Sequence, residues 1–153
     1  MYKNLATQYL TDTLRSYLIK KCSFQSEQET LQQTEECLRF LYLSHLTKGA
    51  IPVCQKIDEI WHLLILQTKE YFELCENLPG KKYIHHSSDI YQQLSRDDNA
   101  KVEAKRQLEW LVSYVKNFGE MKEENIQYWS FANALCKKLN LTSEGFHEEI
   151  YKL

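Results

Sequence analysis

Histidine, carboxylate and thiol side chains concentrate between Asp58 and His86. Asp58 and His62 are four residues apart, so on a helix their side chains lie on the same face. A carboxylate beside an imidazole fixes the tautomer of the ring and orients its second nitrogen. Such a pair serves as a general base, as a metal ligand with its hydrogen-bond partner, or as a structural hydrogen bond. The structural bond is the commonest of these, and the pair by itself leaves all three roles open.

A second pair, His85-His86, follows the helix-breaking sequence Leu78-Pro79-Gly80. About eight residues outside the helix, at ~3.3 Å each, span at most ~26 Å, which is just enough to return to the level of His62. One alternative is therefore a cluster of Asp58 and His62 with His85 or His86, which would bind zinc or another divalent metal. The other is that one of the pair caps the last carbonyls of the preceding helix. We favour the cap.

Cys75 does not fit the same cluster. It follows His62 by thirteen residues, which on a straight helix separates the two by ~20 Å, whereas zinc ligands lie within ~2.0–2.3 Å of one ion. Cys75 instead shares an apolar helical stripe with Tyr71 and Trp61, so these three residues are expected in the core, with Trp61 as its anchor. His45 lies on the stripe of an earlier helix and is expected to be a hydrogen-bonded core residue.

The elements that must position these residues are helices. Apolar residues recur at helical spacing, and 4 Gly and 2 Pro in 153 residues provide few turns for strands. The sequence therefore predicts an all-α fold, one domain over residues 1–153, built as an irregular bundle of about five to six helices. Five main helices are expected, over residues 5–21, 26–49, 53–77, 99–119 and 123–138, together with a short helix 88–94 and a short tail helix 143–152. A capping box of Ser26 and Glu29 opens the second main helix, and the fourth is capped by Asn99 and stopped by Gly119. The clearest stripe is Ile57, Ile60, Trp61, Leu64, Thr68, Tyr71, Phe72 and Cys75.

Composition excludes several classes of function. A net charge of −2 and a pI of about 6.2 give no overall positive field for nucleic acid. The sequence contains neither a signal peptide nor an apolar run as long as a membrane span. Five widely spaced cysteines without a C-x-x-C pair indicate reduced thiols. We therefore expect a cytoplasmic protein that contacts neither nucleic acid nor membrane.

The segment Ile57-Asp58-Glu59-Ile60-Trp61-His62, followed by Thr68, Tyr71, Cys75, Gly80 and Ile84-His85-His86, resembles the conserved segment of the glycine-rich-domain-containing-protein-like family. The resemblance covers about residues 31–129. It implies an intracellular helical module without an established enzyme activity. Many members carry a second histidine where this chain has Leu64, and this departure weakens a metal-site interpretation. Glycine-rich repeats are missing as well.

Three hypotheses for function follow. The first is a non-enzymatic adaptor or regulatory module that binds another protein through the edge formed by Asp58, His62, His85 and His86, and the absence of phosphate-binding loops and hydrolase motifs favours it. The second is a metal-dependent protein of the hydrolase type, with His62 and His85 or His86 as ligands and Asp58 as a third ligand or orienting group. The third is a structural or oligomerising helical protein. A His62-to-loop distance under ~5 Å would make a shared site credible, and one beyond ~10 Å would exclude it.

Overall fold

A computed structural model of the chain describes residues 4–47, 51–86, 100–138, 140 and 142–152. Within these ranges the backbone forms helices and no strand, which confirms the all-α prediction. The helices are α1 Leu5–Tyr9, α2 Asp12–Lys21, α3 Glu27–Leu43, α4 Gln55–Leu66, α5 Thr68–Asn77, α7 Ala100–Phe118, α8 Glu123–Ile126, α9 Ser130–Lys138 and α10 Ser143–Tyr151. The predicted helix 88–94 and the Asn99 cap lie outside the described residues.

The helices outnumber the prediction because three predicted helices are each divided in two. Thr11 accepts a hydrogen bond from the Leu14 amide and starts α2 separately from α1. Gln67, with φ −91° and ψ 71°, separates α4 from α5, and a turn over 127–129 separates α8 from α9. Apolar spacing continues across each of these short breaks, so periodicity alone predicts one helix where the structure has two.

The ends of α3 and α7 show which local signals predict boundaries well. Ser26 and Glu29 form the expected capping box at the start of α3. The prediction that this helix continues to Gly49 is wrong, because α3 ends at Leu43 and turns follow it. Gly119 ends α7 as predicted, with a positive φ of 80° and its amide bonded to the Val115 carbonyl.

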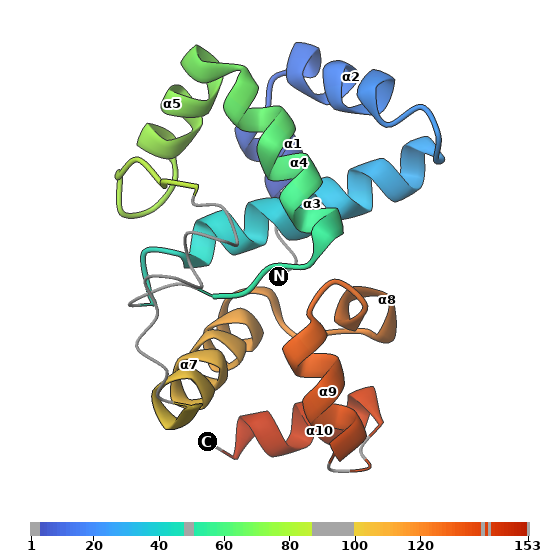
Figure 1. Ribbon diagram of the computed structural model, residues 1–153, viewed down its shortest axis with the longest axis vertical. Coiled ribbons are helices and arrows are strands. Elements are labelled where there is room, and N and C mark those ends of the chain that lie inside the picture. The colour runs from blue at the N-terminus through green and yellow to red at the C-terminus, as the bar shows by residue number, and fades with distance from the viewer. Residues whose placement is uncertain (1–3, 48–50, 87–99, 139, 141, 153) are drawn as a thin grey trace.

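α3 lies at the centre of the molecule. It packs against α1, α2, α4 and α7, and Figure 1 shows it between an upper half containing α1, α2, α4 and α5 and a lower half containing α7–α10. On α3, Phe40 contacts Trp61 of α4 and Trp129, with ring centroids 5.1 Å and 6.2 Å away. Trp129 in turn packs on Trp110 of α7 at 4.2 Å. One aromatic core therefore continues through both halves.

A buried ionic cluster also joins the halves at α3. Glu36 is fully buried and accepts hydrogen bonds from Tyr114 Oη at 3.0 Å, Asn125 Nδ2 at 2.7 Å and Trp129 Nε1 at 2.9 Å. The Arg39 guanidinium lies 3.1 Å from the same carboxylate. Burial raises the pKa of Glu36, whereas Arg39 and the three donors oppose the shift. These contacts fix α3 against α7 and α8.

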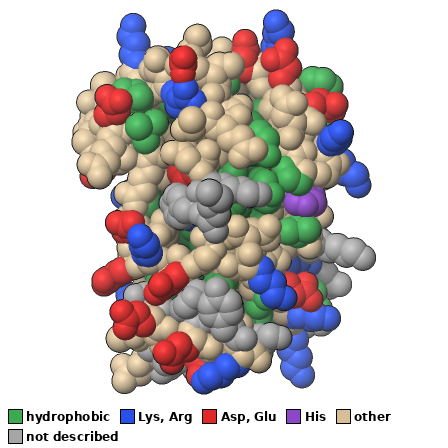
Figure 2. Space-filling model, turned by 180° about the vertical axis from the view of Figure 1, so that it is seen from behind, with side chains coloured by type: hydrophobic (Ala, Val, Ile, Leu, Met, Phe, Trp, Pro, Cys, Tyr) green, Lys and Arg blue, Asp and Glu red, His purple; other side chains and the backbone are tan. Residues whose placement is uncertain are grey.

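None of the described helices combines the length and apolar character needed to cross a membrane. The face opposite that of Figure 1 carries both acidic and basic side chains (Figure 2). This mixture agrees with the small net charge of −2.

Burial raises the pKa of four thiols, those of Cys22, Cys37, Cys54 and Cys136. Because a free thiol ionises near pH ~8.5, the unfolded chain releases these protons at a pH at which the folded protein keeps them. The contribution of these buried thiols to the free energy of unfolding is therefore fully present below pH ~8.5 and is lost as the pH rises above it.

We expect the free energy of unfolding, measured by urea titration, to fall as the pH is raised from ~8 to ~10. Cys37 is fully buried, so Cys37→Ala should reduce the slope by up to ~1.4 kcal/mol per pH unit. Equal slopes for the two proteins would show that Cys37 ionises as readily folded as unfolded.

Candidate metal centre

Two of the candidate residues lie one turn apart on α4. Its buried face carries Ile57, Ile60 and Trp61, and Asp58 and His62 project beside that face. His62 Nδ1 is 3.7 Å from Asp58 Oδ2. The two side chains therefore meet at the edge of the helix, as their spacing predicts.

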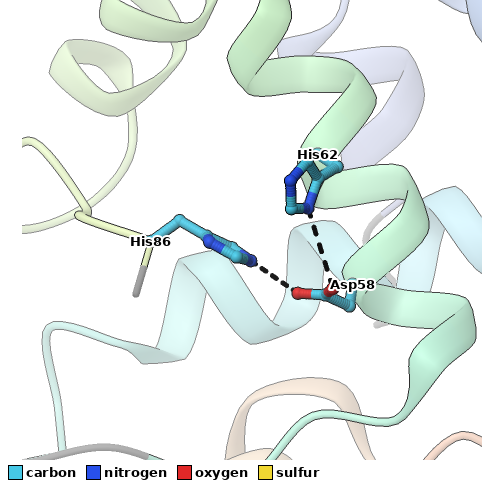
Figure 3. A group of neighbouring side chains, drawn as sticks. All are labelled: Asp58, His62 and His86. Atoms are coloured by element: carbon cyan, nitrogen blue, oxygen red, sulfur yellow. Dashed lines mark hydrogen bonds and ion pairs between the residues drawn. The ribbon is translucent and has the colours of Figure 1, made fainter. Parts of the chain in front are cut away.

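The third residue arrives from the segment that follows α5. His86 Nε2 lies 2.5 Å from Asp58 Oδ1, and the His86 and His62 ring centroids are 4.7 Å apart. One donor atom from each of the three residues lies within 4.8 Å of the others. Figure 3 shows the side chains converging, two from α4 and one from the loop. The capping alternative is wrong for His86, because this ring points to α4 and not to the end of α5.

A chain of hydrogen bonds holds this loop on α4. Trp61 Nε1 donates to Tyr71 Oη at 2.9 Å, and Tyr71 Oη donates to the Ile84 carbonyl at 2.6 Å. The His86 ring meets Trp61 edge to face, with centroids 4.6 Å apart. Burial raises the pKa of Tyr71, so its hydroxyl keeps the proton that it donates. The tryptophan and tyrosine thus position the histidine.

The break at Gln67 allows the Trp61 and Tyr71 side chains to meet. On one straight helix Trp61 and Tyr71 would be ~15 Å apart along the axis, yet their side chains are hydrogen-bonded. The same break changes the phase of α5, so that Phe72, expected on the apolar stripe, is exposed. Trp61, Tyr71 and Cys75 are all buried, as predicted. The predicted ~20 Å separation of Cys75 from His62 assumed one straight helix, whereas the structure divides this helix at Gln67.

A tight turn starts the loop. Gly80 has a φ of 88°, and a Cβ placed there would be 2.6 Å from His45 Cβ. The turn therefore rests against the residues that follow α3, and only glycine fits. The prediction that His45 is a core residue is wrong, because it is exposed; its Nδ1 lies 2.6 Å from the Tyr42 carbonyl.

His85 does not join the other candidates. Its side chain is exposed, and its ring packs against Tyr83 with centroids 4.8 Å apart. Of the four residues predicted for the edge, the structure brings together Asp58, His62 and His86.

The three donors suit a transition-metal ion. Two tetrahedral zinc ligands, each ~2.0 Å from the ion, are ~3.3 Å apart. The separations of 2.5 Å and 3.7 Å from Asp58 to the two histidines lie on either side of this value. Relative exposures are 61% for the His62 side chain, 38% for Asp58 and 15% for His86. The group therefore opens to solvent on the His62 side, where a fourth ligand can approach.

No protein-family model, curated protein or solved structure matches this chain. The resemblance to the glycine-rich-domain-containing-protein-like family therefore stays a prediction, and the function is argued from the geometry of the site.

Proposed function

We propose that this protein binds one divalent transition-metal ion, with zinc as the best-fitting ion, through Asp58, His62 and His86. The observation that carries the proposal is the convergence of three donor atoms within 4.8 Å. Asp58 and His86 are 28 residues apart in the chain, so the tertiary fold and not helical spacing creates the group. Imidazole nitrogen and carboxylate oxygen are both ordinary zinc ligands.

A structural hydrogen bond explains the group less completely. Asp58 and His86 alone would satisfy each other at 2.5 Å, yet the exposed His62 ring lies 4.7 Å from the His86 ring. Two imidazoles beside one carboxylate make a donor set that a single pairing does not require. Structural zinc sites use four protein ligands, whereas catalytic sites use three and keep a position for water. The ligand count supports a hydrolytic role, in which zinc activates that water.

The test is zinc titration of the full chain, purified without a histidine tag, by calorimetry. We expect one zinc per chain in the wild type and a loss of at least ~10-fold in affinity for His62→Ala and for His86→Ala, because each removes a ligand. His85→Ala is the matched control, since it removes a neighbouring imidazole outside the group, and it should retain wild-type affinity.

Two results would contradict the proposal. Absence of stoichiometric zinc, manganese or iron(II) binding by the wild type would leave the three residues as mutual hydrogen-bond partners. An equal loss in the His85→Ala control would place the metal elsewhere.

The binding-module interpretation uses the same edge and stays a prediction. The exposed rings of Phe72 and Tyr83, with centroids 6.4 Å apart, favour it, because they form an apolar surface at the start of the histidine loop. Phe72→Ala separates the two interpretations, since it removes half of this apolar surface and leaves Asp58, His62 and His86 in place to bind zinc.

A further inference from the structure

The geometry points to Tyr71 as the positioning residue of the metal site: through the Ile84 carbonyl it holds His86 within reach of Asp58 and His62. This inference rests on the proposed metal site for its functional meaning. Its structural part, the placement of His86 by Tyr71, can be measured in the absence of metal.

The hydroxyl of Tyr71 is the fixed point of the loop. Its proton goes to the Ile84 carbonyl at 2.6 Å, while its oxygen accepts from Trp61 Nε1 at 2.9 Å. Because the indole N–H occupies one side of the oxygen, the hydroxyl proton is directed to the loop. Ile84 stands two residues before His86, so the bond constrains the approach of the histidine directly.

Few other polar contacts hold this part of the loop. Among the residues that the structure describes, the Ile84 carbonyl is the one backbone group of residues 82–86 with a hydrogen bond. The next backbone bond toward the N-terminus is Lys81 N–H to the Leu78 carbonyl, within the turn itself. His86 has its edge-to-face contact with Trp61 and its bond to Asp58, and neither contact fixes the path of the chain before it.

Trp61 links the ligand and the hydroxyl. The same side chain that packs against the His86 ring, with centroids 4.6 Å apart, orients the Tyr71 hydroxyl. Loss of the hydroxyl therefore releases the loop and leaves the buried indole N–H without its acceptor, while the tyrosine ring keeps its place in the core. Partners that orient metal ligands in this way typically change metal affinity 10–100-fold when removed.

Tyr71→Phe tests the inference, with Tyr83→Phe as the matched control. Tyr83 lies in the same loop and packs on Tyr71 at 5.4 Å, and its hydroxyl makes no hydrogen bond with another described residue. We expect Tyr71→Phe to bind zinc at least ~10-fold more weakly and Tyr83→Phe to bind it as the wild type does.

A spectroscopic readout separates positioning from a general loss of stability. In the copper(II)-loaded protein, electron paramagnetic resonance counts the coordinated imidazole nitrogens. We expect two in the wild type and in Tyr83→Phe, and one in Tyr71→Phe, because His86 leaves the site while the helix still presents His62. Unchanged affinity and two nitrogens in Tyr71→Phe would overturn the inference.

The metal-free protein distinguishes failure of this inference from failure of the proposed function. Trp61 shifts the His86 ring protons in the proton NMR spectrum through its ring current, and Tyr71→Phe should return them toward the free-histidine value. Loss of this shift in a protein whose wild type binds no metal would overturn the metal site and keep the positioning role. Retention of the shift would overturn the positioning role. If circular dichroism shows Tyr71→Phe to be unfolded, the metal-free wild type is measured instead. Its Tyr71 hydroxyl proton, donated to the Ile84 carbonyl, should exchange slowly with solvent in the proton NMR spectrum, and fast exchange would refute the inference.

Discussion

Replacement of Glu36 by glutamine is expected to lower the free energy of unfolding by about 3–5 kcal/mol, the cost of removing one partner from a buried ion pair. Glutamine keeps the volume of glutamate but offers one carbonyl oxygen and an NH₂ group in place of two acceptor oxygens. The donors Tyr114, Asn125 and Trp129 converge on those two oxygens, so at least one of them would face another donor. Arg39 would lose its fully buried counter-charge as well.

Urea unfolding monitored by tryptophan fluorescence measures this effect. Glu73→Gln is the control, since Glu73 is exposed on α5, and its substitution should change stability by no more than ~0.5 kcal/mol. A loss below ~1 kcal/mol in Glu36→Gln would show that Glu36 is already uncharged in the folded protein, because a neutral carboxyl also offers one donor and one acceptor side.

Gly80→Ala is expected to lower the free energy of unfolding by about 2–5 kcal/mol and to weaken zinc binding. The backbone at Gly80 has a φ of 88°, which costs a residue with a Cβ about 1–2 kcal/mol. The added Cβ would lie 2.6 Å from His45 Cβ, and relieving such overpacking typically costs a further ~1–3 kcal/mol. The turn must move away from His45, and the loop that carries His86 moves with it.

Gly119→Ala provides a close control for this substitution. Gly119 has a similar φ of 80°, but a Cβ there meets nothing within 4 Å. Gly119→Ala should lower the free energy of unfolding only by the cost of the positive φ, about 1–2 kcal/mol. The difference in stability between the two variants therefore measures the contact with His45. Addition of His45→Gly to Gly80→Ala should recover most of that difference. Equal losses at the two glycines would show that the turn does not rest on His45.

The sequence predicts the class of fold well because helical periodicity is a local property. Ser26 with Glu29, and Gly119, mark their helix boundaries correctly because caps depend on residues one turn apart. The breaks at Thr11, Gln67 and 127–129 escape prediction, because an apolar face continues across them and the packing of the two parts decides whether the helix bends.

The buried charges were missed for a related reason. Glu35 follows Leu31 by four residues and precedes Leu38 by three, so it lies in phase with the apolar stripe of α3. It accepts the amides of Leu5 and Ala6 and so starts α1. The helical phase of Glu35 is therefore a signal, present in the sequence itself, that this side chain is buried. Glu36 is out of phase with that stripe, and three of its donors, Tyr114, Asn125 and Trp129, follow 78 to 93 residues later.

The residues of the candidate site also differ in whether the sequence alone predicts their positions. The sequence alone determines that Asp58 and His62 share a helix face, because four residues make about one turn, and that a loop with two histidines follows Pro79-Gly80. Only the tertiary structure decides that His86 reaches that face and His85 does not. The bend at Gln67 brings Tyr71 to Trp61, and the Tyr71 hydroxyl then fixes Ile84. Such contacts depend on the direction of packed elements, which spacing along a chain does not encode.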